Sequence, residues 1–551
     1  MSPSLVATGL SFAWPDGTVA FDRLDLAIGS GTTGLIGTNG SGKTTLLRLL
    51  TGELRPRAGV VRATGDVGYL PQNLTLVVDA TVSDLLGVTG IRRALHAIEA
   101  GSVAEADFAA VGEDWDIEER IAAELSRLAL GHLDLDAPVG RLSGGETVLV
   151  HLAGLFLRRL AVLLLDEPTN NLDLDARHRL YAAVEAWPGV MVLVSHDREL
   201  LDRVDQIADL SRDGVRIFGG NFCAYQEVLA VEREAAERAV RTAAADVRQQ
   251  RRDLIDTQTK LAGRERYGRQ QQAAGGIPRI VAHARKRSAQ ESAAKLRGTQ
   301  EQRLSQAQEK LTEAKEAAKS DATIRVDLPG TAVPAGRTVL VARGLTALSE
   351  YSMERVSPDG VAPPLDELIV RGPERIALTG PNGSGKTTLL RAFAGQAELP
   401  GVTVRTAAES GAGAGYLPQR LDLLNDSLSV LDNVRRAAPA ASVNAIRSGL
   451  ARFLFRGMRV GQLAGTLSGG ERFRATLATL LLADPPPQLL LLDEPTNNLD
   501  LASIQQFTSA LAGYRGALLV VSHDRPFLRS LPITRWLRLD PGRGLTEARS
   551  A

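Results

Sequence analysis

A glycine-rich loop of eight residues occurs twice in this chain, each time between a short apolar segment and a leucine-rich stretch. The apolar segments are residues 33–36 and 375–378. The loops consist of Gly37, Thr38, Asn39, Gly40, Ser41, Gly42, Lys43 and Thr44, and of Gly380, Pro381, Asn382, Gly383, Ser384, Gly385, Lys386 and Thr387. Glycines let backbone N–H groups turn inward around an anion, and a following helix adds the positive end of its dipole. The repeated pattern predicts two α/β domains that each cradle phosphate groups.

Four further motifs follow each loop in the same order: a glutamine, Leu-Ser-Gly-Gly-Glu, an apolar run ending in Asp-Glu, and a histidine after Val-Ser. In the first copy their polar residues are Gln72, Ser143, Gly144, Gly145, Asp166, Glu167 and His196. In the second copy they are Gln419, Ser468, Gly469, Gly470, Asp493, Glu494 and His523. The Asp-to-His spacing is 30 residues in both copies, since 196 − 166 equals 523 − 493. A repeat of this length indicates tandem duplication of a whole domain.

The lysine and threonine that end each loop suit a nucleoside triphosphate with its metal. Lys43 and Lys386 are predicted to neutralise charge on the β- and γ-phosphates. Thr44 and Thr387 offer hydroxyl groups to Mg²⁺. The pattern therefore predicts ATP with Mg²⁺ as the bound species.

The carboxylates and histidines of the later motifs predict hydrolysis. Asp166 and Asp493 end apolar runs typical of buried parallel strands, which would place each carboxylate at the edge facing the metal. The next residues, Glu167 and Glu494, are free to polarise the attacking water. A single histidine after a strand is more often structural, but matched histidines in both copies, His196 and His523, favour contact with the γ-phosphate.

The sequence between the two copies, residues 226–325, is rich in Ala, Arg, Gln and Glu. Val240, Val247, Leu254 and Leu261 recur every seven positions, the spacing of a seam between two helices. A helix-breaking Gly-Gly-Ile-Pro cluster interrupts the pattern at residues 275–278. This pattern predicts two long antiparallel helices joined by a turn.

The segment around this turn is basic, although Lys plus Arg and Asp plus Glu number 64 each in the whole chain. Residues 260–297 contain ten Lys or Arg and two Asp or Glu. The candidates for RNA contact are Arg264, Arg266, Arg269, Arg279, Arg285, Lys286 and Arg287. A basic segment poor in aromatic residues suits a phosphate backbone better than stacked bases. The alternative is a solvated hairpin that spaces the two domains.

Composition favours a soluble cytoplasmic protein. Apolar runs such as residues 161–165 fall far short of the roughly 18 residues that a spanning helix needs. The N-terminus lacks the charged and apolar regions of a secretion signal. The single cysteine, Cys223, excludes an internal disulfide framework and a multi-cysteine metal cluster, and is expected to be a small buried residue.

Both copies resemble ATP-binding cassette domains, with Walker A, Q-loop, signature, Walker B and H-loop motifs over roughly residues 4–220 and 335–540. Two cassettes, a long helical linker and no membrane domain resemble the ABC-F subfamily. The resemblance implies two tandem P-loop nucleotide-binding domains of α/β class joined by an α-helical hairpin. The expected domains are residues 1–225, 226–330 and 331–551.

In such cassettes the two domains pack head to tail, so that each ATP lies between the Walker A loop of one and the signature of the other. The resemblance extends the ATP contacts to Thr45, Thr388 and, as the residue stacking on adenine, Trp14. Gln72 and Gln419 join Thr44, Thr387, Asp166 and Asp493 as Mg²⁺ ligands. Tyr351 is the corresponding aromatic candidate in the second copy. Whether the two sites are equivalent stays open, because Thr147 follows the first signature and Arg472 the second.

The resemblance also implies a partner. Members of the ABC-F subfamily act on the ribosome, where the linker enters the tRNA exit site, and they serve as translation factors or protect against antibiotics. The expected partners are rRNA and tRNA, for a monomer with an intramolecular pair of cassettes. The alternative is the fused ATP-binding subunit of a transporter with a separate membrane partner. The sequence leaves open which antibiotic, if any, is involved.

Overall fold

The computed structural model describes most of the chain, and the described residues are 4–72, 80–158, 160–170, 172–211, 214–273, 279–318, 328–350, 363–406, 413–420, 422–497 and 499–548. The chain divides into two compact units, one comprising Met1–Cys223 with Thr323–Ala551 and the other Ala224–Ala322. Within the first unit we call residues 4–221 the N-half and residues 328–548 the C-half. The domain boundaries expected from the sequence stay a prediction.

In the N-half, β5, β6, β7, β3, β8 and β9 lie side by side in that order in one sheet of the described residues. All neighbours are parallel except the pair β8 and β9. A smaller antiparallel sheet has the order β2, β1, β4. The strands are β1 Leu5–Ala13, β2 Val19–Ile28, β3 Gly31–Ile36, β4 Ala58–Ala63, β5 Val67–Leu70, β6 Val162–Asp166, β7 Val190–Val194, β8 Gln206–Ser211 and β9 Gly214–Gly219.

The N-half has a longer helical segment before its signature motif than the C-half has. The helices are α1 Lys43–Leu50, α2 Val82–Leu86, α3 Thr89–Glu99, α4 Glu105–Val111, α5 Ile117–Arg127, α6 Gly144–Leu157, α7 Leu174–Glu185 and α8 Arg198–Leu201. The segment from α3 to α5 accounts for the longer Gln-to-Ser spacing of the N-half, which is 71 residues against 49.

The C-half repeats this topology. Its larger sheet has the order β14, β15, β16, β12, β17, β18 among the described residues, and its smaller sheet has the order β11, β10, β13. The strands are β10 Thr338–Arg343, β11 Glu367–Arg371, β12 Arg375–Thr379, β13 Thr403–Thr406, β14 Ala414–Leu417, β15 Leu489–Asp493, β16 Ala517–Val521, β17 Arg535–Asp540 and β18 Gly544–Ala548. The helices are α11 Ala347–Glu350, α12 Lys386–Phe393, α13 Val430–Ala437, α14 Val443–Arg452, α15 Gly469–Leu481, α16 Leu501–Ala512 and α17 Arg525–Ser530.

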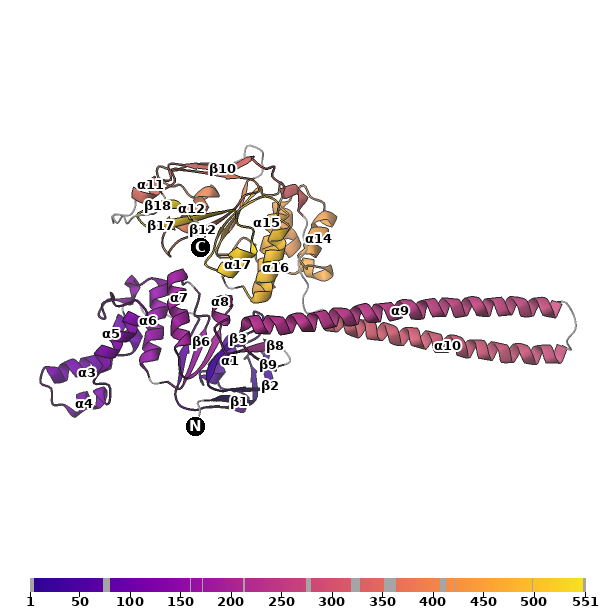
Figure 1. Ribbon diagram of the computed structural model, residues 1–551, viewed down its shortest axis with the longest axis horizontal. Helices are drawn as coiled ribbons and strands as arrows, with labels where there is room; N and C mark the ends of the chain where they lie inside the picture. Colours follow the sequence, from indigo (N-terminus) through magenta and orange to yellow (C-terminus); the bar gives the residue numbers. More distant parts are fainter. Residues whose placement is uncertain are drawn as a thin grey trace. The chain divides into compact units, whose positions relative to one another are not determined.

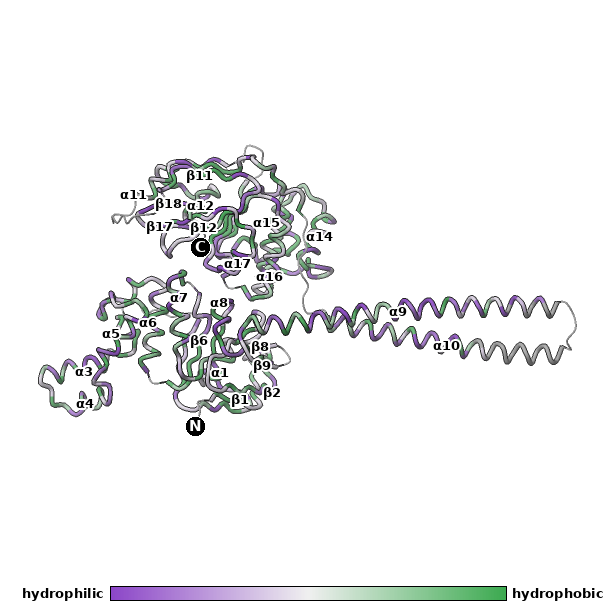
Figure 2. The backbone as a smooth tube through the Cα atoms, viewed as in Figure 1, coloured by the Kyte–Doolittle hydropathy of each residue, from purple (hydrophilic) through white to green (hydrophobic). Residues whose placement is uncertain are grey.

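The central strands β6, β7, β15 and β16 are hydrophobic except for Asp166 and Asp493, which end β6 and β15, and every residue of these four strands is buried (Figure 2). A parallel sheet covered by helices on both faces needs such uninterrupted apolar strands. In the N-half, Leu46, Leu47 and Leu50 of α1 pack with the strands in one core cluster. The sheets therefore form rigid platforms, with the phosphate loops and acidic residues at the carboxyl ends of their strands.

The second unit consists of α9 Phe222–Ala273 and α10 Arg279–Ala317, which run side by side (Figure 1). At a rise of 1.5 Å per residue, the 52 residues of α9 span about 80 Å. Leu261 of the predicted seam is buried, as is Ala307 of α10. The predicted pair of long helices is confirmed, whereas the turn at residues 275–278 lies outside the described residues.

The expected burial of Cys223 is wrong. This residue lies in the first turn of α9, where its side chain is exposed. Its backbone N–H donates to Asp202 Oδ1 at 2.9 Å. The backbone is therefore fixed at the start of the helix while the thiol points to solvent.

Candidate nucleotide sites

The last glycine of each glycine-rich loop has a left-handed backbone conformation and directly precedes a helix. The φ angle is 96° at Gly42, before α1, and 93° at Gly385, before α12. A Cβ atom at Gly42 would lie 2.8 Å from the ring of Phe21, so a side chain would meet both backbone strain and a steric clash. The turn that opens the helix N-terminus therefore requires glycine.

The lysine of each loop folds back over the loop. Lys43 Nζ donates to the carbonyl oxygens of Gly37 at 2.8 Å and Thr38 at 3.2 Å. Lys386 Nζ donates to the carbonyl oxygen of Gly380 at 2.7 Å. Burial lowers the pKa of both lysines, and this effect is opposed by nearby carboxylates such as Glu167 and Glu494. Each ammonium group thus lies at the centre of its loop with acidic residues nearby.

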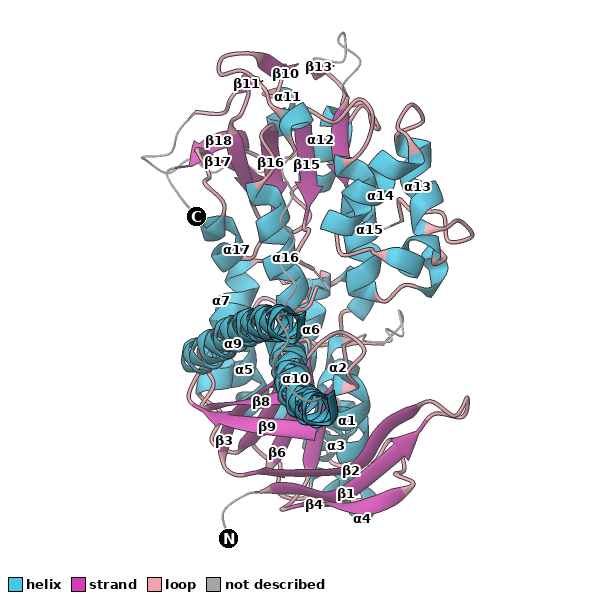
Figure 3. Ribbon diagram, turned by 90° about the vertical axis from the view of Figure 1, so that its right-hand side faces the viewer, coloured by secondary structure: helices cyan, strands magenta, loops and turns pink. Residues whose placement is uncertain are grey.

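The strands β6 and β15, both labelled in Figure 3, each end in an aspartate that accepts a hydrogen bond from a tyrosine. Tyr69 OH donates to Asp166 Oδ2 at 3.4 Å, and Tyr416 OH donates to Asp493 Oδ2 at 3.2 Å. Burial raises the pKa of both aspartates, while hydrogen bonds, including one to the threonine of the loop, lower it. Thr44 is that threonine for Asp166. The hydroxyl and the carboxylate expected to bind Mg²⁺ are therefore in contact in each half.

The glutamates that follow have unusual backbone conformations. The φ angle is +50° at Glu167 and +45° at Glu494, in the left-handed region that side chains rarely adopt. Each is pinned there by its own N–H, which donates at 2.9 Å to Val194 O for Glu167 and to Val521 O for Glu494. An apolar strand pattern alone does not predict this left-handed backbone conformation after the strand.

Each glutamate lies beside the histidine of its own half. His196 Nε2 is 3.2 Å from Glu167 Oε1, and His523 Nε2 is 3.4 Å from Glu494 Oε1. Burial raises the pKa of both glutamates, to about 7 for Glu494. Burial lowers the pKa of both histidines to about 3. The imidazoles are consequently neutral at physiological pH.

The signature serines cap two helices. Ser143 at the start of α6 and Ser468 at the start of α15 each form a reciprocal capping box with the glutamate three positions later. Both serines are exposed. Each capping box satisfies two backbone N–H groups at the helix N-terminus and so fixes where the helix begins.

Residues of opposite halves meet at the first loop. Asn39 N donates to Asp500 Oδ2 at 2.8 Å, and a Cβ atom at Gly469 would lie 3.9 Å from Asn39 Nδ2. At the second loop, Asp173 of the N-half is among the groups that oppose the lowering of the Lys386 pKa. The first loop thus lies next to Gly469 of the opposite signature and next to Asp500, while the second loop lies within the electrostatic reach of Asp173.

The remaining predicted residues are more exposed. Gln72 and Gln419 follow β5 and β14 with exposed side chains, and Trp14 is 37% exposed. Thr45 is half-buried and Thr388 is exposed on the first turns of α1 and α12. Tyr351 lies outside the described residues.

In the basic stretch, Arg264 and Arg266 are exposed on α9. The remaining candidates belong to α9 or α10, but their side chains lie outside the described part of the chain, and they are Arg269, Arg279, Arg285, Lys286 and Arg287.

Sequence reasoning missed the tyrosines and the two aspartates that follow the Asp-Glu motif. Tyr69 and Tyr416 each belong to a repeated Gly-Tyr-Leu-Pro-Gln segment, and Asp173 and Asp500 each end a repeated Pro-Thr-Asn-Asn-Leu-Asp segment. A position-by-position comparison of the two halves would have singled them out. The contacts between the two halves do not correspond to any repeated sequence segment of this kind.

The donor set fits Mg²⁺ and phosphate. Among the described residues, Ser41 Oγ, Ser384 Oγ and Asp166 Oδ1 are buried without a hydrogen-bond partner. Hydroxyl and carboxylate oxygens are the ligands that Mg²⁺ prefers, and buried polar atoms are normally paired. These atoms therefore suit a bound metal–nucleotide group.

Comparison with known proteins agrees with this geometry. The family model described as ABC transporter matches residues 21–170 and 367–497. The tylosin resistance ATP-binding protein TlrC of Streptomyces fradiae is 33% identical over 93% of each chain. The energy-dependent translational throttle protein EttA of Escherichia coli is 30% identical over 90% of this chain and 84% of its own. The archaeal ribosome recycling factor aABCE1, in complex with a ribosomal stalk protein, has a TM-score of 0.55 at 17% identity, covering 98% of this chain and 89% of its own.

The two halves are therefore ATP-binding cassettes, and the protein is an ATPase. Within that class, the chain belongs to the ABC-F family. Across the described residues, no helix combines the length and the apolar character that crossing a membrane requires.

Proposed function

We propose that the protein binds two ATP molecules between its halves, head to tail, and that their hydrolysis drives an action on the ribosome. The observation that carries the first part is the contact of Asn39, in the first loop, with Asp500 and Gly469 of the C-half. One site then joins the loop of the N-half to Ser468, Gly469 and Gly470. The other joins the loop of the C-half to Ser143, Gly144 and Gly145.

The phosphate contacts follow from the loops. Lys43 and Lys386, held at the centre of their loops, would pair with β- and γ-phosphate oxygens. The exposed signature of the opposite half would add backbone N–H groups at a helix N-terminus. Trp14, at the turn between β1 and β2, is the proposed surface for stacking on adenine. Because two halves share each nucleotide, ATP favours the closed arrangement and its loss favours opening.

Each half carries its own hydrolytic group. Glu167 and Glu494 are the proposed groups that polarise the attacking water, and the neutral His196 and His523 beside them are proposed to contact the γ-phosphate. Mg²⁺, when bound, would neutralise charge that develops on the β- and γ-phosphates. Its proposed ligands are Thr44, Gln72 and Asp166 in the N-half, and Thr387, Gln419 and Asp493 in the C-half.

The ribosome is the proposed target because two relatives carry names that fit it. EttA is named as a translational throttle protein, and TlrC as a tylosin resistance protein. Both relatives cover nine tenths or more of this chain, including the helical linker. The exposed Arg264 and Arg266 on α9 supply positive charge for a phosphate backbone. The protein would then work in the cytoplasm as a monomer.

Sedimentation tests the proposal. The variant with Glu167→Gln and Glu494→Gln keeps the shape of both side chains but removes both carboxylates, so ATP should hold it closed. With ATP and Mg²⁺ it should sediment with ribosomes in a sucrose gradient, and without ATP it should remain at the top. Sedimentation as free protein under both conditions would contradict a ribosomal role. Recovery with a membrane protein instead would support the alternative of a transporter subunit.

The linker has its own test. Replacing Arg264 and Arg266 by Gln should weaken ribosome binding and make its dependence on salt less steep, because fewer phosphates are neutralised. Arg248→Gln with Arg252→Gln is the matched control, since both residues are exposed on the same helix outside the basic stretch. Equal losses in the two variants would show that the basic stretch has no special role. Susceptibility to tylosin in a host expressing the protein then separates drug protection from a general role in translation.

A further inference from the structure

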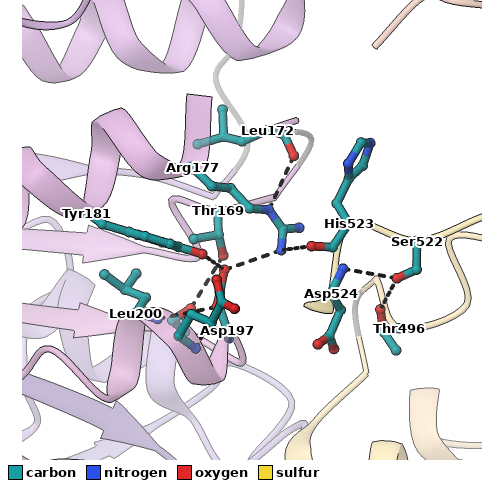
Figure 4. A network of polar contacts seen from close by, with 12 residues as sticks. Thr169, Leu172, Arg177, Tyr181, Asp197, Leu200, Thr496, Ser522, His523 and Asp524 are labelled. Atoms are coloured by element: carbon teal, nitrogen blue, oxygen red, sulfur yellow. Dashed lines mark hydrogen bonds and ion pairs between the residues drawn. The ribbon is translucent and has the colours of Figure 1, made fainter. Parts of the chain in front are cut away.

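One arginine connects the two halves behind their nucleotide sites. Arg177, in the first turn of α7, is almost completely buried. Its Nη1 donates to Asp197 Oδ2 at 3.3 Å within the N-half and to the carbonyl oxygen of His523 in the C-half at 3.4 Å (Figure 4). Its Nε donates to Leu172 O at 3.3 Å. The guanidinium thus holds two histidine loops at once, since Asp197 directly follows His196.

The charges around Arg177 come from both halves. Burial lowers the pKa of Arg177, but Asp197, Tyr181, Glu494 and Asp524 outweigh it and raise the pKa. Burial and the nearby Asp197 raise the pKa of Asp524, and Arg198 and Arg177 partly oppose this rise. Arg177 is therefore a counter-ion shared by acidic groups of the N-half and the C-half.

In the described part of the C-half, the position that matches Arg177 is occupied by an isoleucine. Arg177 and Ile504 each lie four positions after the aspartate that caps their helix, since 177 − 173 equals 504 − 500. Ile504 is 2% exposed and belongs to the apolar core of the C-half. The side chain of isoleucine has no hydrogen-bond donor, and the backbone N–H of Ile504 already donates to Asp500 O at 3.0 Å, so residue 504 cannot make the reverse bond to the carbonyl of His196. At this pair of matching positions, the side-chain hydrogen bond therefore runs from the N-half to the C-half and not in reverse.

We propose that Arg177 is a positioning residue by which the N-half sets the histidine loop of the C-half. Hydrolysis at Glu494 then depends on a cross-half hydrogen bond to the carbonyl of His523, whereas Ile504 offers no such bond to the histidine loop beside Glu167. The contact acts on the carbonyl of His523, whose N–H in turn donates to Glu494 Oε2 at 3.2 Å. The guanidinium of Arg177 is therefore hydrogen-bonded directly to His523, the residue whose backbone N–H holds Glu494. The inference rests on the two cross-half ATP sites proposed above.

Single-site backgrounds test it. Glu167→Gln leaves Glu494 as the working glutamate, and Glu494→Gln leaves Glu167. In the first background, Arg177→Ile should lower kcat for ATP hydrolysis about tenfold with KM changed less than about twofold. In the second, kcat should change less than about twofold, because Asp197 keeps its 2.6 Å bond from Tyr181 OH and its caps on α8.

Two further variants separate positioning from folding. Arg177→Lys keeps a charged donor, so it should recover kcat in the Glu167→Gln background to within about threefold of its value with Arg177. Arg179→Ile, on the same helix but outside this network, should leave kcat unchanged. Equal losses in both backgrounds, a loss confined to the Glu494→Gln background, no loss in either, or no recovery with lysine would each overturn the proposal.

A different experiment tests whether the two ATP sites are shared between the halves. If the signature of the N-half serves the C-half nucleotide, Ser143→Arg should abolish hydrolysis in the Glu167→Gln background and leave most of it in the Glu494→Gln background. The opposite pattern would refute the shared sites whatever Arg177 does. None of these assays needs ribosomes, so their outcome is independent of the proposed target.

Discussion

The N-half and the C-half place most of their predicted nucleotide-binding residues on matching elements, but they pack different side chains behind them. In the C-half, Phe507 stacks on Phe527 and meets Phe473 edge-on, with ring centroids 5.5 and 4.9 Å apart. The residues that match Phe507 and Phe527 in the N-half, 327 positions earlier, are Leu180 and Leu200. Arg177 donates a hydrogen bond to the opposite half, whereas the matching residue of the C-half, Ile504, is buried in that half's own core. The motifs predicted to bind nucleotide are thus repeated in both halves, whereas the side chains that pack behind them differ.

The largest expected effect concerns these cores. Phe507→Ala should lower the free energy of unfolding by about 3–5 kcal/mol, because it removes a fully buried ring from an aromatic cluster. Leu180→Ala should lower it by about 2–4 kcal/mol. Denaturant unfolding followed by probes in each half would measure both. A cost for Phe507→Ala no larger than for Leu180→Ala would show that the aromatic cluster adds no stability.

The glutamates are expected to affect activity about a hundredfold. The variant with Glu167→Gln and Glu494→Gln should lose at least about that factor in steady-state ATP hydrolysis, while nucleotide binding by equilibrium dialysis stays intact. The single variants sharpen the comparison, since equivalent sites would each leave about half of the activity. Glu105→Gln, an exposed glutamate on α4, is the control. Full activity in the double variant would exclude these glutamates from the chemistry.

The tyrosines should have a smaller effect. Tyr69→Phe and Tyr416→Phe each remove one hydrogen bond to the aspartate expected to bind Mg²⁺, which contributes about 1 kcal/mol. The Mg²⁺ concentration needed for half-maximal hydrolysis should rise several-fold. The rise should be greater for Tyr416, whose bond is shorter. Unchanged Mg²⁺ dependence in both variants would assign the tyrosines a packing role alone.

Trp14→Ala should have the smallest effect. Loss of an aromatic face for adenine is expected to weaken ATP binding by about 1 kcal/mol, or roughly fivefold. Binding of ATP and of inorganic triphosphate should be compared by calorimetry. A loss for ATP but not for triphosphate identifies stacking on the base. An equal loss for both would indicate that Trp14 supports the loop instead.

Residue order alone was sufficient to predict the architecture. The two loops, the buried Asp-Glu strands and the seven-residue linker pattern predicted two tandem α/β domains with a helical linker, which the structure and the family comparison confirm. These features are local, because strand burial, glycine turns and helix periodicity depend on neighbouring residues in the chain. The domain boundaries and the roles of the individual site residues stay predictions.

Only the tertiary structure determined the backbone conformations and long-range contacts around the predicted site residues. The left-handed conformations of Glu167 and Glu494 arise from hydrogen bonds to a neighbouring strand, and the exposure of Cys223 depends on where a helix begins. The bond of Arg177 to His523 joins residues 346 positions apart. Pairing over such distances depends on how two folded surfaces meet, and the residues on either side of the contact carry no pattern that a single chain reveals.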